Sequence, residues 1–142
     1  MLGAIQRAGV TIGSHTRSHV FMTNETRERV VEEVRESRNE IERRLGTEVR
    51  HFAYPSGFFN SSVVNAVAAA GYQYGYTTCA HQDPEHPLLT VPRTVLWENS
   101  CLDPHGLFSG AVMSCQVHRA FALVNRCRQR HLVTQEVGNG YL

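Results

Sequence analysis

Several features that would place this 142-residue chain in a membrane or mark it for export are missing. No apolar run approaches the roughly 18 residues that a membrane-spanning helix needs. The opening stretch MLGAIQRAGVTIGSH lacks the charged n-region and the apolar h-region of a secretory signal. The chain as it stands is therefore expected to carry no membrane span and no signal peptide, and its localisation stays unknown.

The charge balance and the cysteine spacing differ from those of nucleic-acid-binding proteins with a basic face and of proteins with CxxC motifs. The 14 basic and 13 acidic residues leave a net charge of +1, which argues against nucleic-acid binding through a large basic face. Cys79, Cys101, Cys115 and Cys127 are too far apart for a CxxC motif. A chain of this length can build a core without disulfides, so reduced cysteines are expected, with two disulfides as the alternative.

What the sequence does contain is a regular alternation of helical and strand-like segments. The clearest helix covers 25–45, where Val30, Val34 and Ile41 lie on a 3.6-residue stripe and Gly46 ends it. This alternation predicts parallel strands joined by crossover helices, an α/β fold. Further helices are expected over 4–9, 63–70 and 111–132, and strands over 10–14, 49–54, 72–78 and 91–97.

Two predicted strands end in segments that carry chemistry. The first ends in Gly-Ser-His-Thr-Arg-Ser-His, which places His15 and His19 four residues apart. Positions i and i+4 share a face in a strand and in a helical turn, so either backbone can direct both imidazoles at one cation. The second ends in Pro55-Ser56-Gly57, a turn whose backbone N–H groups can stabilise an oxyanion. By spacing alone, surface histidines and an ordinary turn remain the alternatives.

Together, these segments resemble the NodB-type polysaccharide deacetylases, carbohydrate esterase family 4. The resemblance rests on GVTIGSHTRSH, a charged helix, RHFAYPSG and AAAGYQYGYTT in the family's order, and it runs from Ala4 to Val95. It implies a partial, distorted (β/α) barrel, with residues 1–110 as the deacetylase part and 111–142 as a C-terminal helix and tail. Family members often act at the cell envelope or outside the cell.

The resemblance also implies roles for single residues. His15 and His19 would hold a divalent metal, with zinc the expected ion, and Thr16 would orient their loop. Arg50 would hold the catalytic base, and the N–H of Ser56 would stabilise the oxyanion. Phe52, Tyr54 and Pro55 would contact the substrate, an acetylated polysaccharide or oligosaccharide, with the two rings as walls of a sugar groove.

One family motif is missing from the chain. The family's T-F-D-D-G strand supplies the catalytic base and the third metal ligand, whereas no acidic residue precedes His15 here. The sequence is therefore expected to be truncated at its N-terminus, with self-association through exposed sheet edges. A metal-dependent deacetylase is the first hypothesis, and an inactive remnant with weak metal or glycan binding is the alternative. Other site candidates, by residue type alone, are His81, His86, His105, His118, His131, Asp83 and Asp103.

Overall fold

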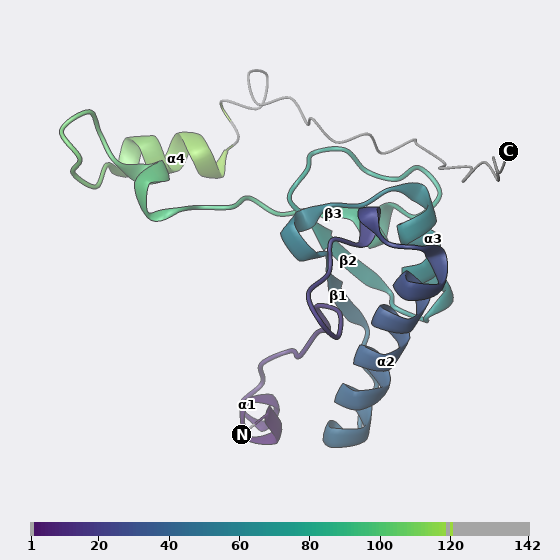
Figure 1. Cartoon of the computed structure of the whole chain (residues 1–142). Coiled ribbons are helices and arrows are strands. Elements are labelled where there is room, and N and C mark those ends of the chain that lie inside the picture. Colours follow the sequence, from purple (N-terminus) through teal and green to yellow (C-terminus); the bar gives the residue numbers. More distant parts are fainter. Residues whose placement is uncertain (1, 119, 121–142) are drawn as a thin grey trace, which may run out of the picture.

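The computed structural model describes residues 2–118 and 120 (Figure 1). Within this part of the chain, no helix is long and apolar enough to cross a membrane. Residues 121–132 of the expected last helix, with Cys127 and His131, lie outside the described residues. The helices are α1 (Leu2–Arg7), α2 (Arg27–Leu45), α3 (Ser61–Ala69) and α4 (Gly110–Val117), and the strands are β1 (His51–Ala53), β2 (Tyr74–Thr77) and β3 (Val91–Pro92).

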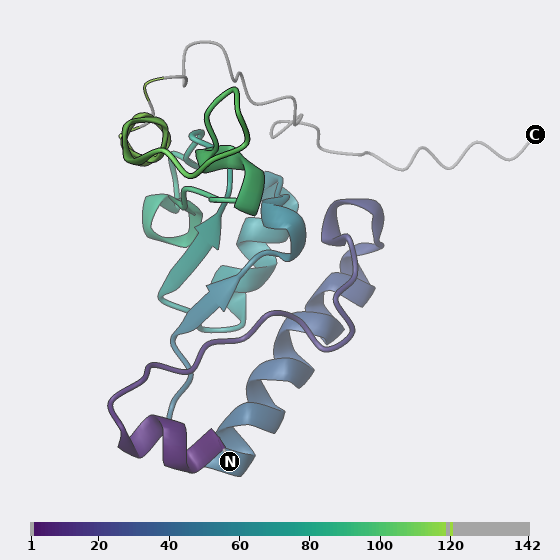
Figure 2. The same cartoon turned by 90° about the vertical axis from the view of Figure 1, so that its left-hand side faces the viewer.

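The three strands form one parallel sheet in the order β1-β2-β3, which confirms the α/β prediction. Figures 1 and 2 show α2 and α3 together on one side of this sheet. Phe52 of β1 points into the layer between sheet and helices, where it is fully buried with Val34 of α2 and Val64 of α3. Burial of these side chains supplies the main stabilisation of the fold.

Helix α2 forms where the sequence pattern places it, and its ends have clear causes. The Thr26 side chain accepts a hydrogen bond from the N–H of Arg29 at 3.3 Å, so the helix begins after Thr26. Gly46 ends it in the left-handed conformation, with φ of 67°. Farther along, Arg38 donates to the Ala70 carbonyl at the end of α3 and lies over the ring of Tyr72, which ties the two helices together.

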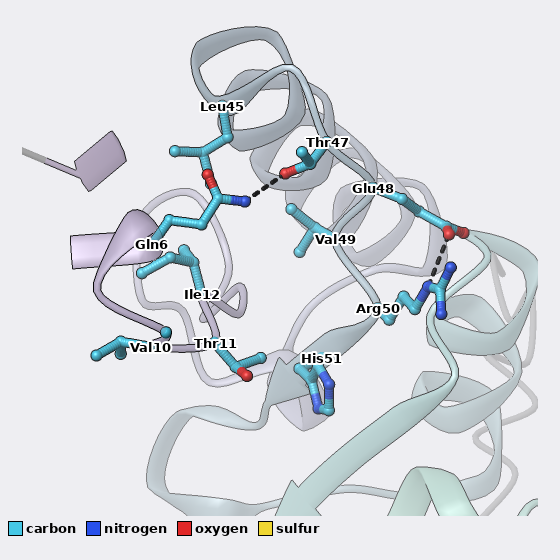
Figure 3. A pocket seen from close by; sticks show the side chains of 11 residues that line it. Gln6, Val10, Thr11, Ile12, Leu45, Thr47, Glu48, Val49, Arg50 and His51 are labelled. Atoms are coloured by element: carbon cyan, nitrogen blue, oxygen red, sulfur yellow. Dashed lines mark hydrogen bonds and ion pairs between the residues drawn. The ribbon is translucent and has the colours of Figure 1, made fainter. Parts of the chain in front are cut away.

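The expected strand over 10–14 is present only at its last residue. Ser14 pairs with β1 by donating to the His51 carbonyl at 2.8 Å and accepting from the N–H of Ala53 at 2.8 Å. Before Ser14, the chain moves away from β1, and a cavity of about 310 Å³ opens between residues 9–12 and 47–51 (Figure 3). The N–H of Val10 donates to the Ile5 carbonyl of α1 at 3.3 Å instead of to β1, and residues 10–12 do not form a strand.

The expected strand over 91–97 also ends early, at Pro92. The N–H of Arg93 still donates to the Thr77 carbonyl at 2.8 Å, and the chain then leaves the sheet. The following residues, with a short 3-10 turn at Glu98–Cys101 and helix α4, extend away from the sheet (Figure 1). This arm, residues 93–118, exposes Trp97, Leu107 and Phe108 to solvent.

Candidate functional site

The loop between Ser14 and Val20 holds the two predicted metal ligands close together. The ring centroids of His15 and His19 are 4.8 Å apart, the rings meet edge to face, and both side chains are exposed. Thr16 and His19 have left-handed backbones, with φ of 65° and 59°. The Thr16 hydroxyl accepts a hydrogen bond from the N–H of His19 at 3.0 Å, in agreement with the orienting role expected for it. Left-handed backbones in residues other than glycine are uncommon and concentrate at functional sites.

His15 is fixed by the end of strand β1. Its Nδ1 lies 2.7 Å from the carbonyl oxygen of Ala53. Because a carbonyl only accepts, Nδ1 carries the proton and the neutral ring keeps its lone pair on Nε2. Metal-binding histidines in proteins are typically held in this way by a backbone carbonyl. The hydrogen bond therefore fixes the His15 ring and leaves its Nε2 available to another partner.

The histidine loop is held by hydrogen bonds to Glu33 of α2, which is fully buried. Its carboxylate accepts from the N–H groups of Arg17 and Ser18, both at 2.8 Å, and from the Ser18 hydroxyl at 2.6 Å. The Arg29 guanidinium lies 2.7 Å away and completes the pairing. Burial acts to raise the pKa of this carboxyl, but the hydrogen bonds from Ser18 and Arg17 and the charge of Arg29 outweigh it, so the pKa lies below its ordinary value.

Glu33 was not among the residues predicted from the sequence, although the pattern contains a signal for it. It follows Val30 by three residues and precedes Val34 and Ser37, so it lies on the inward stripe of α2. A carboxylate on such a stripe must be paired, because an unpaired buried charge is costly. Its partners on the histidine loop could have been sought on that ground.

The turn after β1 lies beside the histidine loop. Ser56 is exposed and left-handed, with φ of 55°, and its carbonyl accepts from the Thr78 hydroxyl at 3.2 Å. Gly57 follows with φ of 74°, and a Cβ on it would lie 2.1 Å from Oγ1 and 2.6 Å from the backbone N of Thr78. Only glycine fits this position, so the contact with Thr78 fixes the shape of the turn.

The three residues expected to contact the sugar are buried in the core. Phe52 and Tyr54 are fully buried core residues, and Tyr54 donates its hydroxyl to the Leu89 carbonyl at 2.8 Å. Pro55 is buried as well. Side chains two apart on a strand share a face, so the burial of Phe52 carries Tyr54 into the core with it. Neither ring is exposed to solvent, although Phe52 borders a hollow of about 430 Å³ together with Ser14, His15 and Ala53.

Arg50 lies at the amino end of β1, whereas His15 is bound at the carboxyl end. Three residues of strand separate their attachment points by about 10 Å. The Arg50 side chain is exposed, and its Nε donates to the Glu48 carboxylate at 2.7 Å beside the cavity in Figure 3. The structure does not bring Arg50 to the histidine pair.

A metal ion fits the histidine pair only in part. Two nearby imidazoles, one with its tautomer fixed, suit zinc or a similar divalent cation. Across residues 2–118 and 120, however, no group of three or more His, Cys, Asp or Glu side chains gathers in a metal-binding arrangement. The described residues thus offer at most two of the three protein ligands that a catalytic zinc site usually has.

Comparison with solved structures places this fold among the deacetylases. The Streptococcus pyogenes deacetylase PplD in complex with acetate matches with a TM-score of 0.66 at 20% identity, over 82% of this chain and 48% of that one. IcaB from Ammonifex degensii matches with a TM-score of 0.58 at 20% identity, over 70% and 47%. A Bacillus cereus polysaccharide deacetylase matches with a TM-score of 0.54 at 25% identity, over 61% and 28%. The chain spans between 28% and 48% of the length of these structures.

The fold is accordingly part of the (β/α) barrel of NodB-type deacetylases. The family model for polysaccharide deacetylase matches residues 1–75, just over half of the 142-residue chain. The chain belongs to the polysaccharide deacetylase family, which confirms the resemblance seen in the sequence. No curated protein sequence matches it.

Proposed function

We propose that this chain carries the metal-binding and oxyanion-stabilising loops of a metal-dependent deacetylase that hydrolyses acetyl amides on a polysaccharide. The observation that carries the proposal is the bond from His15 to the Ala53 carbonyl. It joins the histidine loop to the strand that leads directly into the turn at Pro55–Gly57. The proposed cation ligand His15 and the proposed oxyanion donor, the N–H of Ser56, are thereby attached near one end of one strand.

The proposal gives each residue of the site a defined role. His15 and His19 would hold the divalent metal, which when bound would polarise the carbonyl of an acetamide group. The N–H of Ser56 would donate to the oxygen of that carbonyl as negative charge develops on it. Glu33 is a positioning residue, because it acts on the histidines through Arg17 and Ser18, binding both of their N–H groups and the Ser18 hydroxyl.

We expect the purified protein, supplied with zinc, to release acetate from a chitooligosaccharide. The change His15→Ala should lower the rate by at least about 100-fold, because the metal contributes several kcal/mol to the transition state. His118→Ala removes an exposed histidine on the arm and should leave the rate unchanged. Equal rates in His15→Ala and His118→Ala would contradict the proposal.

A non-catalytic family member that binds metal or glycan weakly is the second candidate. It is favoured because, among the described residues, no third metal-binding side chain gathers with the two histidines. The same assay separates the two candidates. Oligosaccharide binding by a folded protein that releases no acetate would support the second.

A further inference from the structure

Two phenylalanines face solvent next to the histidine loop and the turn. Phe21 is 49% exposed and Phe58 is 38% exposed, whereas Phe52 and Phe59 are buried. The rings of Phe21 and Phe58 contact each other, with centroids 6.0 Å apart and planes tilted by 35°. We call these two residues the aromatic pair.

The aromatic pair joins the two functional loops. Phe21 follows His19 by two residues, and Phe58 directly follows Gly57 and lies two residues after Ser56. Two residues of chain span at most about 7 Å, so each ring is attached close to one half of the proposed site. A substrate held at the histidines therefore has these rings within reach of its neighbouring groups.

Beyond the aromatic pair, the same two chain segments line a cavity of about 480 Å³. The cavity lies between the first turns of α2 and α3; five of its ten lining residues carry hydroxyl or amide side chains, and Glu25, Arg27 and Glu28 are charged. Its volume lies in the range of small-molecule sites. The polar side chains without charge that line it are Thr23, Asn24, Thr26, Asn60 and Ser62.

We propose that the aromatic pair and this cavity form a subsite for a sugar ring next to the one that carries the reacting acetyl group. A pyranose has an apolar C–H face and a rim of hydroxyl groups. The aromatic rings can pack against the C–H face, and the amide and hydroxyl groups can form hydrogen bonds with the sugar hydroxyl groups. The inference rests on the proposed function, which it extends from the acetyl group to the polysaccharide around it. It also assigns to Phe21 and Phe58 the sugar contact that the sequence assigned to Phe52 and Tyr54.

The test is calorimetric titration of the full chain with N-acetylglucosamine and with its β-1,4-linked tetramer. Phe21→Ala and Phe58→Ala should each weaken tetramer binding by at least about fivefold, because each removes a half-exposed apolar surface from the contact. Affinity for the monosaccharide should change less. Phe58→Tyr keeps the ring and should bind as the unchanged protein does. Phe108→Ala is the matched control, since Phe108 is 68% exposed but lies on the arm.

The outcomes separate the subsite from the catalytic proposal. Loss of tetramer affinity in both pair variants, with Phe108→Ala unchanged, supports the subsite even if no acetate is released. Equal affinity in all variants, or no tetramer binding by the unchanged protein, overturns it, even where acetate release depends on His15. Sedimentation that shows a dimer lost in Phe58→Ala, at unchanged sugar affinity, also overturns it, because the pair would then be a contact between two copies.

Discussion

Replacing Glu33 with alanine is expected to lower the free energy of unfolding by about 3 kcal/mol, the usual cost of breaking a buried, hydrogen-bonded ion pair. The change leaves two backbone N–H groups and the Ser18 hydroxyl of the histidine loop without their acceptor. Urea unfolding followed by circular dichroism measures the loss. The loop should also lose its fixed shape, visible as faster amide exchange at Arg17 and Ser18.

A matched pair of variants separates this role from the general effect of changing a charge on α2. Glu36→Gln alters a half-exposed glutamate of the same helix and should change stability by less than about 0.5 kcal/mol. Glu33→Gln keeps the volume but not the charge. Equal stability of the two glutamine variants would contradict the assigned role of Glu33.

The acid response of Glu33→Gln follows from the same pKa shift. The folded-state pKa of Glu33 lies below its value of 4.5 in the unfolded chain. Its carboxylate therefore stabilises the fold in full above pH 4.5 and loses this contribution as the pH falls through the folded pKa. Glu33→Gln should lack this part of the acid-induced loss of stability.

Replacing Gly57 with alanine is expected to cost about 2–4 kcal/mol and to displace the turn that holds Ser56. One part of the cost is the left-handed backbone, and the larger part is the collision of a Cβ with Thr78 at 2.1–2.7 Å. Gly46→Ala isolates the first part, because Gly46 has φ of 67° and nothing within 4 Å of its Cβ position. Thermal unfolding of both variants measures the difference. A Gly57→Ala protein as stable as Gly46→Ala would contradict the tight turn.

Most of the fold could be predicted because its signals are local. The stripe on α2 and the Asn60 cap, whose side chain accepts from the N–H of Val63 at 2.9 Å, lie within single segments. Strand lengths depend instead on distant partners. Residues 10–12 have strand-forming side chains, but the structure opens a cavity where their partners would lie.

The sequence singled out the histidine pair but not the residues that support its loop. His15 and His19 are visible as a spaced motif, and the structure places their rings together. Glu33 has a signal in the stripe of α2, but its partners on the histidine loop and the contact within the aromatic pair lie across elements and are seen only in the folded chain. The family resemblance implied Phe52 and Tyr54 as walls of a sugar groove, whereas the alternation of strand faces places both rings in the core.

The most direct test of the central claim, that His15 and His19 form a metal-binding pair, is a zinc titration of the metal-free protein by calorimetry. We expect about one zinc ion per chain, bound more weakly than at a site with three protein ligands. Both His15→Ala and His19→Ala should abolish this binding, and His118→Ala should not. Zinc binding that survives both substitutions, or no binding by the unchanged protein, would contradict the claim.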